Sequence, residues 1–135
     1  MSRKQSRRIA FQIIYSLGFG GEALLNDETQ ASLDETIPEG AESEYIRNIC
    51  ETVKKNLETI DNYITKFSKG FSLDRLFKVD IAILRMGTAE ILFTDTPNIV
   101  AIDSAVELAQ KYSTPKSADF VNGVLASINE AVCSC

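Results

Sequence analysis

Apolar residues recur every three or four positions through almost all of this 135-residue chain, and this spacing limits its possible folds more than any other feature. One stretch of the pattern contains Ile46, Ile49, Cys50, Val53, Leu57 and Ile60. A period near 3.6 residues indicates an amphipathic helix, whereas a half-buried strand alternates at every second residue. No alternating stretch is long enough to compete, so the sequence predicts an all-α protein with about seven helices.

The N-terminal half contains a clear first helix and then a weaker region. The first helix is predicted from about residues 2 to 17, and it ends at Gly18 because glycine favours helix termini. The acidic stretch 22–44 supports either a short helix or a mobile connection. Helical spacing then returns, and Asp61 is placed to cap a second segment that ends near Gly70.

The C-terminal half is expected to contain the most buried helix. A short segment opening at Ser72 or Asp74 leads into residues 79–93, which are mainly apolar and are expected to form a central helix buried on several sides. Pro97 ends this helix, because proline removes a backbone donor and disfavours helix at the preceding residue. Pro115 separates two further helices, which include Val100 and Phe120 in their apolar stripes.

Composition excludes several classes of protein. With 44% hydrophobic and 24% charged residues, the chain has the composition of a globular protein with room for one domain. Its apolar runs are too short to cross a bilayer. The absence of histidine rules out a Ser-His-Asp or Cys-His relay, and the glycines near residue 20 lack the spacing of a phosphate-binding loop. We therefore expect no catalytic residues and no cofactor.

The cysteines give no reason to expect a metal site or a disulfide framework. Three cysteines are an odd number, which suits the reducing cytoplasm. Cys133 and Cys135 make only half of a zinc site, and Cys50 or a carboxylate would have to complete it.

Positive charge is concentrated at the start of a chain whose net charge is −5. The cluster consists of Arg3, Lys4, Arg7 and Arg8. On a helical wheel these residues lie opposite the apolar stripe, together with Phe11 and Tyr15. Cations beside aromatic rings suit single-stranded nucleic acid, because cations hold phosphates and rings stack on bases. A solvated tail, a membrane-surface or calmodulin-binding helix and a secretory signal are the alternatives.

Four segments of the sequence resemble the NusB transcription antitermination family. They are S-R-R-I-A-F-Q-I-I-Y (6–15), V-D-I-A-I-L-R-M-G-T-A-E (79–90), V-A-I-D-S-A-V-E-L-A (100–109) and F-V-N-G-V-L (120–125). The last segment is the most specific, and the resemblance covers nearly the whole chain in the right order. The acidic stretch has no recognisable match.

The resemblance implies a NusB-like fold of two small helical subdomains, at about residues 1–70 and 71–135, within a single domain. It also implies a cytoplasmic protein without enzymatic activity. Such a protein binds boxA RNA together with the ribosomal protein NusE. The pair joins the RNA polymerase elongation complex and suppresses termination, chiefly on ribosomal RNA operons.

The same resemblance assigns roles to individual residues. The RNA-binding set is Arg3, Lys4, Arg7, Arg8, Gln12, Lys116, Phe120 and Asn122, and the partner interface contains Tyr15 and Glu90. Arginine and lysine would contact phosphates, whereas the amides of Gln12 and Asn122 can bind base edges. Phe120 either stacks on a base or belongs to the core. Glu90 is unusual on an apolar helix, and its carboxylate is expected either at a solvated edge or, preferably, against a donor of the partner.

Two other functional classes remain open at this stage. The second hypothesis is a stand-alone RNA-binding module related to the domain found ahead of certain ribosomal RNA cytosine methyltransferases. A protein-interaction scaffold, whose basic helix docks an acidic partner, is the third hypothesis. The apolar surface could also serve a homodimer.

Overall fold

The computed structural model describes residues 3–17, 43–69 and 73–133, and within them the protein is entirely helical. The elements are α1 (Arg3–Leu17), α3 (Ser43–Lys55), α4 (Leu57–Phe67), the 3-10 turn η2 (Leu73–Arg75), α5 (Lys78–Phe93), α6 (Asn98–Tyr112) and α7 (Pro115–Cys133). No strand occurs in these ranges. The all-α prediction is confirmed. None of the helices in the described part of the chain has both the length and the apolar character needed to span a membrane.

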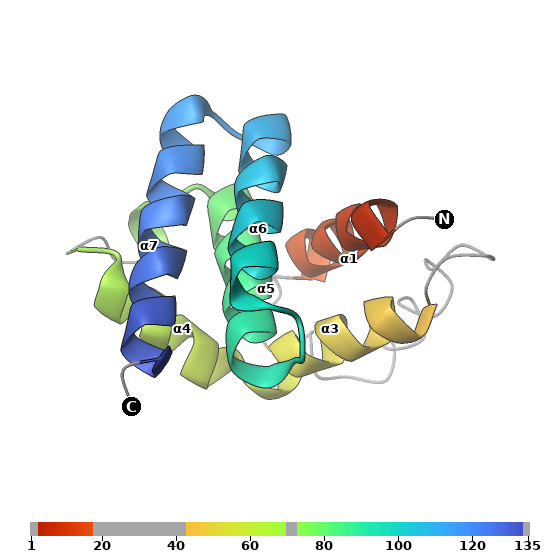
Figure 1. Ribbon diagram of the computed structural model, residues 1–135. Coiled ribbons are helices and arrows are strands. Elements are labelled where there is room, and N and C mark those ends of the chain that lie inside the picture. Colours follow the sequence, from red (N-terminus) through yellow and green to blue (C-terminus); the bar gives the residue numbers. More distant parts are fainter. Residues whose placement is uncertain (1–2, 18–42, 70–72, 134–135) are drawn as a thin grey trace.

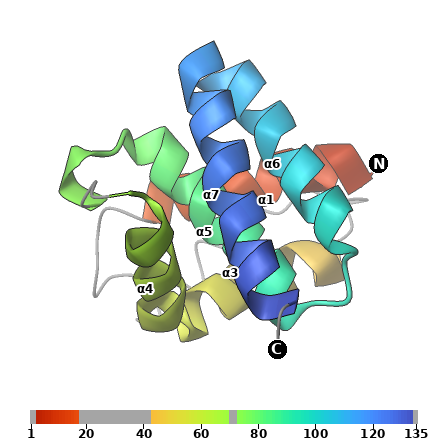
Figure 2. The ribbon, with the colours of Figure 1, turned by 60° about the vertical axis from the view of Figure 1, so that its left-hand side comes forward.

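Helix α5 is the centre of the molecule, as its apolar composition predicted. It packs against α1, α3, α4, α6 and α7, and ten of its sixteen residues are buried. Figures 1 and 2 show it surrounded by the other helices. Gly87 permits close packing on one side, since a Cβ atom built there would lie 2.7 Å from Cδ1 of Leu125 in α7. A helix that is apolar on most sides requires such neighbours.

Four of the remaining helices form two pairs around α5, and α4 packs against α5 and α7. Helices α6 and α7 lie side by side and antiparallel, joined by a short corner at Ser113 and Thr114 (Figure 1). Helices α1 and α3 pack together and against α5. The rings of Phe11 and Tyr112, with centroids 5.0 Å apart, connect α1 to the C-terminal end of α6. This contact places the basic helix beside the α6–α7 corner.

Three details of the sequence-based description are wrong. Asp61 does not cap a helix: the break falls at Asn56, and Asp61 lies inside α4. There its two carboxylate oxygens accept hydrogen bonds from Nε and a terminal nitrogen of Arg85, each at 2.9 Å. Phe11 is only 3% exposed and its ring contacts that of Tyr112, so it is not on an open side of α1. Val100 is exposed rather than buried.

Several predictions fall on residues outside the described ranges. They include the helix end at Gly18, most of the acidic stretch 22–44, Gly70, Ser72 and the side chain of Asp74. Cys135 is also outside them, whereas Cys50 is buried in the core and Cys133 is exposed. Within the described residues no three metal-ligating side chains cluster together.

Candidate nucleic-acid interface

The four cations of α1 lie in its first two turns, where the helix contains no acidic residue. The structure does not leave them as one patch. Arg3 and Arg7 turn toward α3, where the Arg3 guanidinium lies 4.1 Å from the ring centroid of Tyr45. Lys4 and Arg8 turn toward α6 and line a pocket with it. The cations of α1 therefore lie on two sides of the helix, one facing α3 and the other facing α6.

Arg7 belongs to a buried ion-pair network that connects three helices. Its Nε and a terminal nitrogen donate hydrogen bonds to the two carboxylate oxygens of Glu90 in α5, at 3.4 and 3.1 Å. The side chains of Arg7 and Glu90 are only 10% and 2% exposed. The hydroxyl of Tyr45, in α3, donates a further hydrogen bond of 3.4 Å to Glu90.

The charges of this network stabilise one another. Burial alone would lower the pKa of Arg7, but the hydrogen bond and the negative charge of Glu90 outweigh burial and leave that pKa raised. Burial and then the charge of Glu90 raise the pKa of Tyr45, so its hydroxyl stays protonated and can donate. Because its guanidinium is paired with a buried carboxylate, Arg7 holds α1 on α5 and α3.

Glu90 therefore meets a donor in its own chain. The sequence analysis expected its carboxylate either at a solvated edge or against a donor of the partner. In the structure its donor is Arg7, which is 83 positions away in the sequence. Tyr45 is a member of the network that the sequence reasoning missed. An acid in the middle of a mainly apolar stretch was a signal that a buried donor should be sought.

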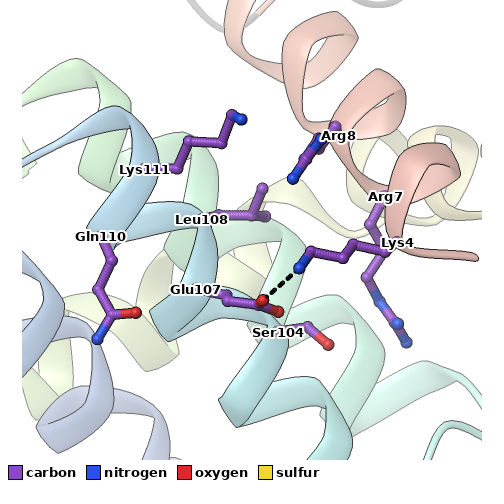
Figure 3. A pocket seen from close by; sticks show the side chains of 8 residues that line it. All are labelled: Lys4, Arg7, Arg8, Ser104, Glu107, Leu108, Gln110 and Lys111. Atoms are coloured by element: carbon purple, nitrogen blue, oxygen red, sulfur yellow. Dashed lines mark ion pairs between the residues drawn. The ribbon is translucent and has the colours of Figure 1, made fainter.

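Lys4 and Arg8 line a pocket of about 370 Å³ between α1 and α6 (Figure 3). Figure 3 shows Lys111 of α6 extending toward Arg8 from the opposite wall. The Lys4 ammonium makes an ion pair of 2.7 Å with Glu107, and both side chains remain more than half exposed. Arg7, Ser104, Leu108 and Gln110 complete the lining. Three accessible cations against one exposed carboxylate make this pocket suitable for an anion.

Lys116 and Phe120 line a second pocket, of about 520 Å³, on the other side of the α6–α7 corner. Its walls also include Arg75, Leu76 and Phe77. The corner itself is held by the buried carboxylate of Asp80, which accepts hydrogen bonds from the hydroxyls of Ser113 and Ser117 at 2.8 and 2.7 Å.

The structure brings together some predicted site residues and separates others. Lys4 and Arg8 share one pocket, and Lys116 and Phe120 share another. Gln12 and Asn122 are exposed on α1 and α7 but line neither pocket. Tyr15 is half-buried, with its ring centroid 6.2 Å from that of Phe11.

The sequence reasoning missed the cation Lys111, the acid Glu107 and the aromatic ring of Phe77. The first two lie at a four-residue spacing on one helix face, which the sequence alone could have shown.

The sequence matches the family model described as "NusB family" over residues 4–130. The chain belongs to the NusB family. A transcription antitermination protein NusB of Acetivibrio thermocellus is 42% identical, with 95% of this chain and 88% of the relative covered. The resemblance seen in four sequence segments is thus confirmed over nearly the whole chain.

Solved NusB structures also share its fold. NusB of T. maritima superposes with a TM-score of 0.84 at 34% identity, covering 96% of this chain and 92% of the other. The NusB chain of a structure described as antitermination factors NusB and NusE in complex with dsRNA gives a TM-score of 0.77 at 32% identity, with 96% of each chain covered. The helices around α5 are therefore arranged as in other NusB proteins.

Proposed function

We propose that this NusB protein binds boxA-type single-stranded RNA together with NusE, and that the pair joins the RNA polymerase elongation complex during ribosomal RNA transcription. The protein acts in the cytoplasm as a binding factor and not as an enzyme. A NusB relative of the same fold has been crystallised with NusE and RNA, which supports the assignment of partners.

The observation that carries the proposal is the cationic pocket between α1 and α6. Lys4 and Arg8 project from the first two turns of α1. The N-terminus of a helix carries a partial positive charge, which repels cationic side chains nearby. A phosphate bound there would neutralise both the side chains and the helix terminus. Lys111 supplies a third cation from α6. Glu107 compensates only one of these three cations, so the pocket keeps a positive charge that an anion can neutralise.

We assign the other predicted RNA contacts to surfaces outside this pocket. Arg3 is exposed next to Lys4, and the amides of Gln12 and Asn122 are exposed and available to base edges. Lys116 and Phe120 extend the surface beyond the α6–α7 corner. Tyr15 remains the proposed contact to NusE, whereas Arg7 and Glu90 serve this surface by holding α1 in position.

The test is an anisotropy titration of labelled boxA RNA with the protein alone and with NusE. We expect weak binding alone and tighter binding with NusE. Arg8→Ala should weaken both, because a phosphate contact is lost, whereas the matched surface variant Lys66→Ala on α4 should change neither. An Arg8→Ala variant that binds like the wild type would show that the pocket does not hold RNA.

A pull-down with purified NusE, with and without boxA RNA, separates this function from a protein-interaction scaffold. The proposal expects RNA to strengthen capture of NusE. Capture that is identical with and without RNA would favour the scaffold.

A further inference from the structure

Phe77 has no structural role that its position explains. It is the N-cap residue of α5, with extended backbone angles, and its side chain makes no capping hydrogen bond. Serine, threonine, aspartate and asparagine are preferred there, because their oxygen atoms accept from the first backbone N–H groups. The ring does not support the core either, since Phe77 is 64% exposed. Residues that break a local rule without a compensating contact often belong to functional sites.

The surroundings of Phe77 suggest what its ring binds. It lines the pocket of about 520 Å³ together with the ring of Phe120 and the side chains of Leu76 and Pro115. That volume lies within the range of about 300–1,000 Å³ typical of small-ligand pockets. Two cations, Arg75 and Lys116, lie on the same lining. The site therefore combines aromatic faces with positive charge.

We propose that Phe77 is a base-stacking residue of this protein. A nucleobase of the bound RNA enters the pocket between η2, α5 and α7 and stacks on the Phe77 ring beside Phe120, while Arg75 and Lys116 contact neighbouring phosphates. This inference rests on the proposed RNA-binding function and extends it to a residue outside the predicted site. Proteins that bind single strands combine aromatic platforms and cations in this way.

Charge and continuity favour an RNA strand over a protein segment as the occupant. An apolar pocket for a protein would not need two cations on its lining, whereas a strand carries one phosphate per nucleotide. The pocket and the proposed phosphate site lie on either side of one corner. Lys111, in the last turn of α6, lines the phosphate site, and Lys116, in the first turn of α7, lines the pocket of Phe77. A strand bound at Lys4, Arg8 and Lys111 can therefore continue toward Phe77.

The absence of tryptophan from the chain permits a direct test. In Phe77→Trp the new indole is the only one in the protein, and a base stacked on it should quench its fluorescence. Ile99→Trp is the control, because Ile99 is 71% exposed at the opposite end of α6 from the corner. Both variants are titrated with unlabelled boxA RNA, in parallel with anisotropy on labelled RNA.

We expect RNA to quench the fluorescence of Phe77→Trp at the concentration at which anisotropy reports binding. The fluorescence of Ile99→Trp should not change with RNA. Inorganic phosphate should quench neither variant. Bound RNA without quenching of Phe77→Trp would overturn the inference while leaving the proposed function intact. If the wild type binds no RNA with or without NusE, the proposed function fails, and the stacking role with it.

Further substitutions of Phe77 test whether RNA binding requires an aromatic ring or only an apolar side chain. Phe77→Ala and Phe77→Leu should each weaken RNA binding about fivefold to a hundredfold, whereas Phe77→Tyr should retain it. Their melting temperatures should match the wild type, since the ring is exposed. Full affinity in Phe77→Leu, or a loss of NusE binding without RNA in Phe77→Ala, would assign this pocket to apolar contact with a protein.

Discussion

Replacing Arg7 by methionine should destabilise the protein strongly, although Arg7 belongs to a basic cluster at the end of the chain. Glu90 is 2% exposed and, among the residues that the structure describes, would keep only the Tyr45 hydroxyl, at 3.4 Å, as a hydrogen-bond donor. Removing one partner of a buried ion pair costs about 3–5 kcal/mol, because the other charge remains buried without compensation. For a domain of this size that loss corresponds to a fall in melting temperature of about 11–18 °C.

Urea and thermal unfolding followed by circular dichroism measure this effect. Arg8→Met is the matched control, since no described residue forms an ion pair with Arg8, and its free energy of unfolding should change by no more than about 0.5 kcal/mol. Glu90→Leu should destabilise as Arg7→Met does, and the double variant Arg7→Met, Glu90→Leu should lose less than the sum of these two single variants. If Arg7→Met and Arg8→Met are equally stable, the network does not hold α1, and Arg7 is available to bind RNA.

Two further predictions concern a charged residue of the pocket and a thiol of the core. Glu107→Gln should tighten RNA binding by about 1.5- to fivefold in the anisotropy assay. A phosphate at Lys4 must displace the ion pair with Glu107, and an exposed ion pair contributes only about 0.2–1 kcal/mol. Weaker binding would mean that Glu107 itself helps to hold RNA. Burial, and then the charge of Glu51, raises the pKa of Cys50 to about 12. The thiolate is the form of cysteine that reacts. In a Cys133→Ser, Cys135→Ser variant, the remaining thiol of Cys50 should therefore resist a thiol reagent at pH 8 until the protein is denatured. Rapid labelling of the native variant would contradict the packing of Cys50.

The sequence predicted most helices correctly because their signals are local. The apolar stretch before Pro97 and the helices on either side of Pro115 follow from periodicity and from the chemistry of proline. The prediction that Asp61 caps a helix was wrong because its carboxylate pairs with Arg85 of another helix. No local rule contains a contact between two helices.

The candidate site was predicted in part for the same reason. A helical wheel finds the cations of α1 but shows neither the contact of Phe11 with Tyr112 nor the pairing of Glu90 with Arg7. The division of the cluster into a structural side and an accessible side is a property of tertiary packing. The sequence groups Phe77 with Leu73 and Leu76 as an apolar segment of the core, so only its exposure in the folded protein draws attention to it.

The salt dependence of RNA binding tests the central claim most directly, namely that the pocket between α1 and α6 holds phosphates. The sequence reasoning did not propose Lys111, so Lys111→Ala examines the structure independently of the resemblance. The slope of log K against log salt should become shallower by about one unit in Lys111→Ala and in Arg8→Ala, and should be unchanged in Lys66→Ala. Identical slopes and affinities for the wild type, Lys111→Ala and Arg8→Ala would place the RNA elsewhere on the protein.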